Sequence, residues 1–99
     1  MYAVLRRYNT HRGSAEQILQ RVNQGFVPLI SKTPGFVAYY VVNAGDEIVS
    51  VSIFEDKRGA DESTKAASEW VRQNLHGLIT TAPVIIAGEV GAQHLATVP

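Results

Sequence analysis

The chain has 99 residues, of which 45% are hydrophobic and 18% charged, so it is long enough for one folded domain and too apolar for intrinsic disorder. Its nine Lys and Arg residues balance nine Asp and Glu residues, which argues against binding to nucleic acid or a membrane. It has no cysteine, which excludes disulfides and thiolate chemistry. No apolar run approaches the roughly 20 residues that span a bilayer, and Arg6 and Arg7 stand where a signal peptide would be apolar, so we expect a cytoplasmic protein.

The first part of the chain predicts a strand followed by a helix. Residues 2–8 mix aromatic and β-branched side chains before the turn-prone Asn9, which is typical of a strand. Apolar residues then recur at spacings of three and four through residues 14–30, which predicts an amphipathic helix. Pro28 lies within this pattern, where we expect it to bend the helix or end it early.

The second part predicts a hairpin, a helix and a last strand. Residues 35–42 and 48–54 are apolar runs around a short turn that contains Asn and Gly. A second apolar stripe follows the charged residues at 56–61 and predicts a helix that reaches Leu78. The apolar run at residues 84–90 predicts a last strand. We therefore expect one ferredoxin-like domain over residues 1–91 and a partly mobile C-terminal tail over residues 92–99.

This order of elements predicts an α+β fold of the ferredoxin-like βαββαβ type, with a four-stranded antiparallel sheet and both helices on one face. The face of such a sheet that is not covered by helices should be polar. Residues 36–42 and 84–87 are instead apolar on both faces. Because the chain has no further element to cover the second face, we expect a homodimer in which two sheets pack face to face.

Several segments carry a resemblance to a known family. They are the Thr-Pro-Gly-Phe string at residues 33–36, the Val-Ser-Ile-Phe-Glu-Asp string at residues 51–56 and the helix through residues 67–72, together with the first strand and helix. In these segments the chain resembles the antibiotic-biosynthesis-monooxygenase group of the dimeric α+β barrel superfamily. The resemblance implies paired ferredoxin-like subunits. Members of this group include cofactor-free monooxygenases of polyphenols or quinols, haem-degrading enzymes, signal-molecule isomerases and proteins of no known activity.

The chain departs from its relatives at positions that bear on chemistry. Relatives often place a histidine near the start of the second helix, whereas residues 60–65 contain none. Some relatives also pair an asparagine with a tryptophan four residues later, and here the position four before Trp70 is Ala66. The resemblance therefore implies the fold much more strongly than the reaction.

Two pairs of residues are the main candidates for a substrate site. Trp70 and Asn74 share one helical face, where an indole and an amide could hold a planar aromatic substrate, with Asn74 as the catalytic residue; alternatively, Trp70 borders the core and Asn74 belongs to the exposed rim. Tyr39 and Tyr40 point to opposite faces of their strand, so one of them could orient a substrate hydroxyl, or both could serve packing. With Trp70 and the two tyrosines, we include Phe36 among the substrate-binding candidates.

Arg6 and Arg7 are the charged residues that need an explanation. They send one guanidinium to each face of the first strand, so one of them enters a packed environment or lies at an edge. A buried arginine needs a partner, such as Glu55 or Glu89. We interpret it either as part of an ion pair at the edge of the dimer or as a clamp for an anion or enolate.

Metal and cofactor sites are not indicated by the remaining residues. His11, His76 and His94 have no spacing typical of metal ligands, and no phosphate-binding or dinucleotide-binding glycine loop occurs, so we expect neither a metal nor another cofactor. His76 has one alternative reading, as an axial haem ligand. At 3.6 residues per turn, however, it is turned well away from Trp70 around the helix.

Three hypotheses for function follow. The first is a cofactor-independent monooxygenase-like enzyme that binds a small aromatic quinol or polyphenol between the sheet and the helix of Trp70, so that the substrate itself supplies the electrons. The second is a non-catalytic dimer that binds a hydrophobic ligand or accompanies another enzyme, which the absence of a clear general base supports. The third is haem binding and degradation, which depends on His76 alone.

Overall fold

Strands and helices follow one another along the chain in the βαββαβ order that the sequence predicts. The computed structural model describes residues 1–10, 13–79 and 81–96. Its elements are β1 (Tyr2–Asn9), α1 (Ala15–Arg21), the π-helical segment η1 (Val22–Phe26), α2 (Val27–Ile30), β2 (Phe36–Asn43), β3 (Glu47–Phe54), α3 (Lys57–Asn74) and β4 (Val84–Glu89).

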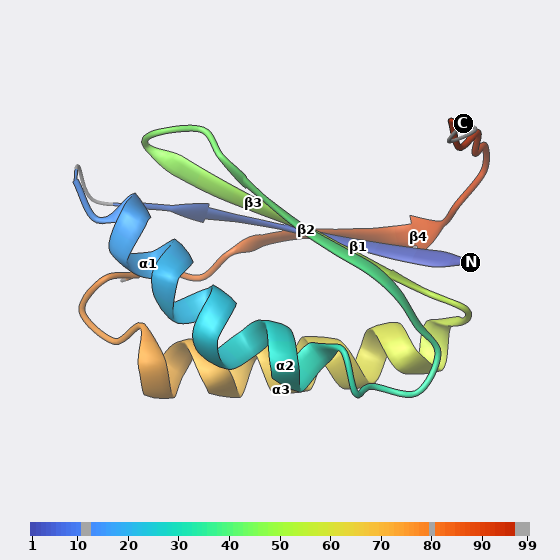
Figure 1. Cartoon of the computed structure of the whole chain (residues 1–99), viewed down its shortest axis with the longest axis horizontal. Helices are drawn as coiled ribbons and strands as arrows, with labels where there is room; N and C mark the ends of the chain where they lie inside the picture. Colours follow the sequence, from blue (N-terminus) through green and yellow to red (C-terminus); the bar gives the residue numbers. More distant parts are fainter. Residues whose placement is uncertain (11–12, 80, 97–99) are drawn as a thin grey trace.

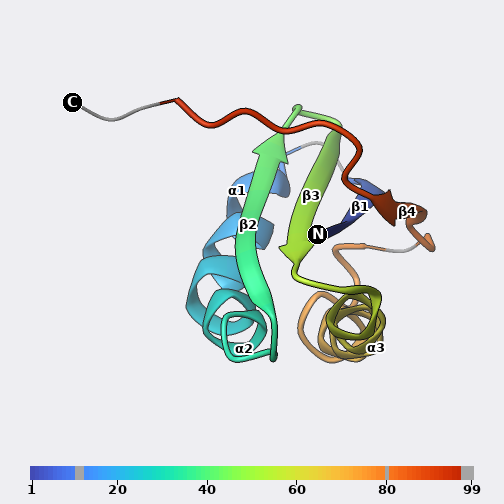
Figure 2. The same ribbon diagram turned by 90° about the vertical axis from the view of Figure 1, so that its right-hand side faces the viewer.

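The four strands form one antiparallel sheet in the order β2-β3-β1-β4. The first helical stretch and α3 lie on the same side of this sheet, and the other side carries no helix (Figures 1 and 2). This arrangement confirms the predicted ferredoxin-like α+β fold. Each of the two crossovers, through α1–α2 and through α3, leaves the sheet at one end and returns to it at the other, which places both helices against the strands.

The first helix continues past Pro28 without ending early. The segment Val22–Phe26 widens into a π-helix, in which the backbone N–H of Val27 donates to the carbonyl of Val22. Because proline lacks an N–H and its ring would strike the carbonyl four residues earlier, a wider turn directly before it accommodates the ring. The chain then remains helical to Ile30.

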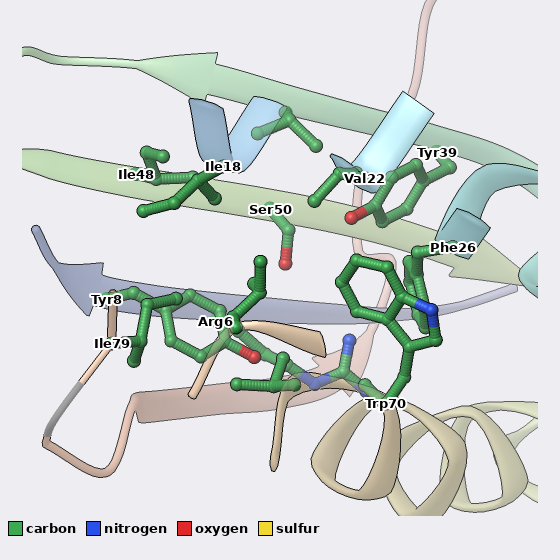
Figure 3. Close-up of a pocket in the computed structure, with 14 residues that line it drawn as sticks. Arg6, Tyr8, Ile18, Val22, Phe26, Tyr39, Ile48, Ser50, Trp70 and Ile79 are labelled. Carbon is green, nitrogen blue, oxygen red and sulfur yellow. The ribbon is translucent and has the colours of Figure 1, made fainter. Parts of the chain in front are cut away.

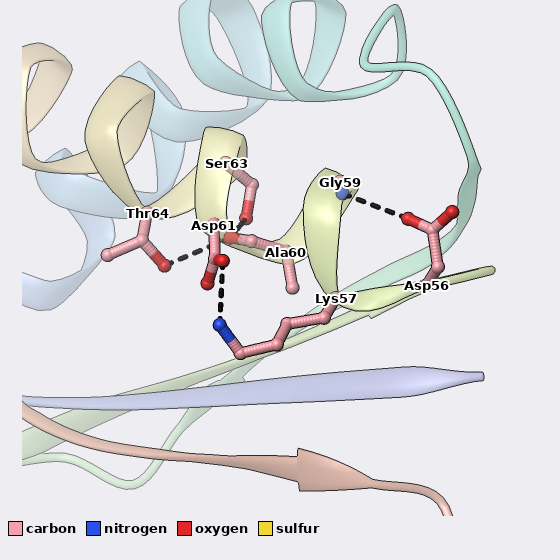
Figure 4. Close-up of polar contacts among 7 residues, drawn as sticks. All are labelled: Asp56, Lys57, Gly59, Ala60, Asp61, Ser63 and Thr64. Carbon is pink, nitrogen blue, oxygen red and sulfur yellow. Dashed lines mark hydrogen bonds and ion pairs between the residues drawn. The ribbon is translucent and has the colours of Figure 1, made fainter.

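The start of α3 is held by its own side chains (Figure 4). The Asp56 carboxylate accepts a hydrogen bond from the backbone N–H of Gly59 at 3.2 Å, which caps the helix. A side chain at Gly59 would bring its Cβ within 2.8 Å of the Pro34 carbonyl oxygen, so this close approach of helix and loop requires glycine. One turn further on, the hydroxyls of Ser63 and Thr64 both donate to the carbonyl of Ala60.

The hydrophobic core lies between the helices and the covered face of the sheet, and its buried members are Val4, Ala15, Ile18, Val22, Phe26, Ile30, Ile48, Phe54, Ala60, Ala67 and Leu75. Three large apolar side chains on the opposite, open face are mostly exposed: Tyr40 at 62%, Val42 at 53% and Ile86 at 63%. The apolar second face expected from the sequence is therefore present.

Beyond β4 the described chain has no regular structure. The backbone N–H of Val90 donates to the Met1 carbonyl at 2.9 Å, and residues 91–96 then leave the sheet. The last three residues of the expected tail, 97–99, lie outside the described residues, as does His11. Among the helices that the structure describes, none combines the length and apolar character needed to cross a membrane.

Candidate functional site

A small cavity lies between the covered face of the sheet and the two helices that pack on it (Figure 3). Its volume, as accessible to a molecule the size of water, is about 30 Å³. Arg6 and Tyr8 reach it from β1, Tyr39 from β2 and Trp70 from α3. The remaining lining is largely apolar and consists of Ile18, Val22, Phe26, Val41, Ile48, Ser50, Ala67, Val71, Leu75 and Ile79. We call this space the inner cavity.

The period of two along a strand explains which residues of the sheet meet there. Arg6 and Tyr8 are two positions apart on β1 and both are buried, whereas Arg7 between them is exposed and forms an ion pair with Glu47 at 3.1 Å. On β2, Tyr39 faces the cavity, and Tyr40 lies on the open face. The question that the sequence left open for each pair is thereby answered.

Arg6 is buried without a carboxylate partner. The residue is 2% exposed, and none of the ion pairs among the described residues includes it. Its Nη2 atom donates to Thr64 Oγ1 at 2.8 Å and to Ser63 Oγ at 3.3 Å, and its Nη1 atom donates to Ser52 Oγ at 3.5 Å. The expected partners Glu55 and Glu89 are exposed, so the sequence-based prediction of an acidic partner was wrong.

The hydroxyl groups around Arg6 act as neutral acceptors. Ser63 and Thr64 already donate their own hydrogens to the carbonyl of Ala60, at 2.7 and 3.1 Å, so only their oxygen lone pairs face the guanidinium. The Nε atom of Arg6 is buried and has no hydrogen-bond partner among the described residues. A full positive charge with one unused donor thus borders an apolar space, an arrangement that favours a bound anion.

Burial also shifts the titration of the polar groups in the cavity. Desolvation lowers the pKa of Arg6, and it raises the pKa of Tyr8, although the nearby Arg6 charge opposes the latter shift. Desolvation, together with Tyr8, raises the pKa of Tyr39 to about 12, against smaller opposing effects of Arg6 and Ser50. Both phenols therefore remain protonated near neutral pH and can donate a hydrogen bond.

Trp70 forms one wall of the inner cavity through contacts with the first helix. Its ring centroid lies 5.4 Å from that of Phe26, which in turn lies 5.5 Å from Tyr39 in an edge-to-face arrangement. Gly25, beside Phe26 in the π-helical segment, leaves room for the indole, because a Cβ there would lie 3.1 Å from Trp70 Cζ2. The π-helix thus shapes the wall opposite the sheet.

A second, larger space begins on the other side of Arg6. This outer cleft, of about 450 Å³, lies between α3 and the segment that leads into β4. It shares Arg6, Tyr8, Val71 and Ile79 with the inner cavity, and its other lining residues are Thr64, Ser68, Arg72, His76, Thr81, Ala82, Pro83 and Ile85. Among the described residues that line it, three are basic (Arg6, Arg72 and His76) and none is acidic.

The structure separates the remaining candidate residues from the inner cavity. Asn74 is exposed, and its amide Nδ2 donates to the Trp70 carbonyl at 3.0 Å, so the pair is joined through the backbone and not across a pocket. Tyr40 lies on the open face of the sheet. Phe36 packs edge-to-face on Phe54, with ring centroids 6.1 Å apart, and does not line the inner cavity.

Arg6, Tyr8 and Ser50 complete the polar lining; the sequence analysis considered Arg6 or Arg7 as an anion clamp without choosing between them, and it did not include Tyr8 or Ser50. The signal was present for Arg6, since one of two adjacent arginines on a strand must face inward. The same alternation places Tyr8 beside it. Ser50 gave no signal, because a serine in a strand is usually exposed.

Metal ligands are not grouped in the part of the chain that the structure describes, where no three His, Cys, Asp or Glu side chains lie together as a metal site. His76 is exposed in the turn after α3 and lines the outer cleft, away from Trp70.

The family to which the chain belongs is shown by its sequence. Residues 1–71 match the antibiotic biosynthesis monooxygenase family, so the chain is a member of that family. The match covers all but the last turn of α3 and ends before β4. A comparison with curated proteins found no match.

Solved structures share the fold at low sequence identity. A monooxygenase from Streptomyces coelicolor in complex with nanaomycin D is 16% identical, with a TM-score of 0.75 over 97% of this chain and 92% of that one. SnoaB, a cofactor-independent oxygenase from Streptomyces nogalater, is 14% identical, with a TM-score of 0.69 over 93% and 94%. A MhuD mutant with two manganese protoporphyrin IX molecules per active site is 11% identical, with a TM-score of 0.78 over 97% and 100%. The likeness to proteins with different ligands supports the fold and leaves the reaction open.

Proposed function

We propose that this protein is a homodimeric, cofactor-independent oxygenase that acts on a small aromatic quinol or polyphenol. The observation that carries the proposal is Arg6, a buried cation with no carboxylate partner and an unused Nε donor, at the boundary of an apolar cavity. Such a group stabilises a phenolate or enolate more strongly than it would in water, because the surroundings screen its charge less. The family membership and the cofactor-independent oxygenase among the structural neighbours agree with this chemistry.

In the proposed reaction the substrate supplies all the electrons. A hydroquinone and O₂ give a hydroxyquinone and water: one oxygen atom is inserted into a ring C–H bond, and the other leaves as water with the two hydrogens of the quinol hydroxyls. Of the four electrons, two come from the quinol and two from the ring carbon. Arg6 lowers the pKa of the substrate hydroxyl and holds the resulting phenolate, whereas the protonated hydroxyls of Tyr8 and Tyr39 act as hydrogen-bond donors.

The homodimer is supported by the open face of the sheet. Tyr40, Val42 and Ile86 expose large apolar surfaces on a face that carries no helix. Contiguous apolar patches of this kind mark interfaces in soluble proteins. A second copy of the chain, placed sheet against sheet, covers this surface and leaves the inner cavity of each subunit on its own helical side.

Oxygen consumption with a panel of hydroquinones tests the proposed activity. The wild-type protein is expected to consume O₂ faster than buffer with at least one member of the panel. Arg6→Met should lower that rate on the order of 100-fold to 1000-fold, the loss expected when one placed donor to a developing oxyanion is removed. Arg7→Met is the matched control, since Arg7 is adjacent in sequence, lies on the opposite face and forms only a surface ion pair. Equal losses in both variants, or no consumption at all, would refute the proposal.

One observation favours a second candidate function, a non-catalytic dimer that binds an aromatic or hydrophobic ligand. Among the described residues that line the inner cavity there is no carboxylate or imidazole to act as a general base. Ligand binding detected by calorimetry or by quenching of Trp70, without O₂ consumption and with loss of binding in Arg6→Met, would support this function over the oxygenase.

A further inference from the structure

Two spaces of very different size meet at one wall. The inner cavity offers about 30 Å³ and the outer cleft about 450 Å³, and both are bordered by Arg6, Tyr8, Val71 and Ile79. The reaction proposed above has two reactants that also differ greatly in size, a diatomic gas and an aromatic ring. The sizes of the two spaces therefore bear on where each reactant binds.

The inner cavity is too small for an aromatic ring. An apolar protein cavity that binds benzene measures about 150 Å³, whereas roughly 10 to 15 Å³ is enough to accept one water-sized molecule. A space of about 30 Å³ holds a molecule of two heavy atoms and not one of six or more. The outer cleft has ample volume for a substituted ring.

The lining of each space agrees with this division. Most of the inner lining consists of aliphatic and aromatic side chains from the sheet and both helices, which suits an apolar gas. The outer cleft combines apolar Ile85 with the cationic Arg72 and with His76, which suits an aromatic molecule that carries an acidic hydroxyl or a carboxylate. The buried Arg6, with its unpartnered Nε, lies between them, where negative charge would develop on both the ring and the oxygen.

We propose that the outer cleft binds the aromatic substrate, that the inner cavity binds O₂, and that the two react across the shared wall at Arg6 and Tyr8. This assignment rests on the proposed oxygenase function. It also gives Trp70 and Tyr39 a defined task, since they line the O₂ compartment and do not stack on the substrate.

Dissolved O₂ is the probe for the inner cavity, because it is paramagnetic and speeds the relaxation of nearby nuclei. In NMR spectra recorded under O₂ pressure, with N₂ as reference, the methyl groups of Ile18, Val22 and Ile48 should relax faster than their burial alone allows. Val22→Ile adds one methylene to the cavity wall and should reduce this effect to the level of other core methyls. Val27→Ile makes the same change on a half-buried residue outside the cavity and should leave the effect intact. Relaxation that follows only solvent exposure would overturn the assignment.

Kinetics of two variants test the division independently. Val22→Ile should raise KM for O₂ about 10-fold or more, the usual effect of one misplaced methylene in an apolar pocket, and leave the affinity for the aromatic substrate unchanged. Ser68→Phe, which obstructs the outer cleft, should weaken the affinity for the aromatic substrate and leave KM for O₂ unchanged. Lys65→Phe, on the same helix and outside the cleft, is the control and should change neither quantity. Both variants affecting the same KM would overturn the division.

The two proposals fail in distinguishable ways. Localised O₂ relaxation in a protein that consumes no hydroquinone would refute the oxygenase function and leave an O₂-sized cavity. Hydroquinone turnover without localised relaxation would support the oxygenase and refute the assignment of the inner cavity to O₂.

Discussion

The two faces of the sheet both depart from the usual distribution of polar and apolar side chains. The covered face, under the helices, holds a full positive charge at Arg6 and the serines Ser50 and Ser52, all buried. The open face presents Tyr40 and Ile86, both more than half exposed. Covered faces normally carry the apolar side chains and open faces the polar ones.

We interpret these departures as a sign that each face has a role beyond the folding of one subunit. A buried cation without a counter-ion lowers stability, and the anionic substrate of the proposed function would supply the missing negative charge. An exposed apolar face lowers solubility, and the second subunit of the proposed homodimer would cover it. Each explanation can be tested by altering one face and leaving the other intact.

The largest expected effect comes from placing a charge on the open face. In a face-to-face dimer, Tyr40→Glu buries an unpaired carboxylate, which should cost about 3 to 5 kcal/mol of association, or roughly 100-fold to several-thousand-fold in Kd. Sedimentation or light scattering at micromolar concentration measures it. Leu29→Glu, on α2 and 45% exposed, is the control and should remain dimeric. A wild-type monomer would show that the open face needs no partner.

Alkaline pH should destabilise the covered face through Tyr39. Its pKa is raised to about 12 in the folded protein, so above its ordinary value near 10 the unfolded chain loses the phenolic proton first. The free energy of unfolding should therefore fall as pH rises from about 10 to about 12, by about 2 kcal/mol from this group. Denaturant titrations on either side of this range should show a smaller fall in Tyr39→Phe than in Tyr40→Phe. Tyr8, whose pKa burial also raises, should retain part of the fall in both variants.

Removing the buried charge should lower the proposed activity without destabilising the subunit. Arg6→Met deletes the desolvated guanidinium, whereas Ser63 and Thr64 keep their hydrogen bonds to the Ala60 carbonyl. The free energy of unfolding is expected to stay level or rise by about 1 kcal/mol. Chemical denaturation of Arg6→Met and of the surface control Arg7→Met measures the difference. A loss of several kcal/mol specific to Arg6→Met would show that Arg6 is a structural residue.

The smallest expected effect concerns the wall between the first helix and α3. Gly25→Ala places a Cβ 3.1 Å from Trp70 Cζ2, so the indole must shift by a few tenths of an ångström. The emission of the single tryptophan should change, with a loss of stability of at most about 1 kcal/mol. Gln24→Ala, exposed in the same π-helical segment, should leave the spectrum unchanged. An unchanged spectrum in Gly25→Ala would mean that the indole does not contact this segment.

The order of the elements could be predicted because it depends on local patterns, although α3 ends at Asn74 and not at Leu78 as the apolar stripe predicted. Alternation in the strands and spacings of three and four in the helices are visible over a few residues, and they identified both helices and all four strands. The same alternation indicated that Arg6 and Arg7, like Tyr39 and Tyr40, lie on opposite faces. Helical spacing likewise indicated that Trp70 and Asn74 share a face, whereas only the structure showed that the Asn74 amide donates to the Trp70 carbonyl.

By itself, therefore, the sequence determined the ferredoxin-like fold, its family and an apolar second sheet face. Only the tertiary structure decided which arginine is buried and what surrounds it, because Arg6 is bonded to hydroxyls 46 to 58 residues away, on β3 and α3. It likewise decided that Tyr39 and Trp70 share a cavity and that a larger cleft borders it. Such sites form where elements distant in sequence converge, so the pattern within any one of them does not contain the site.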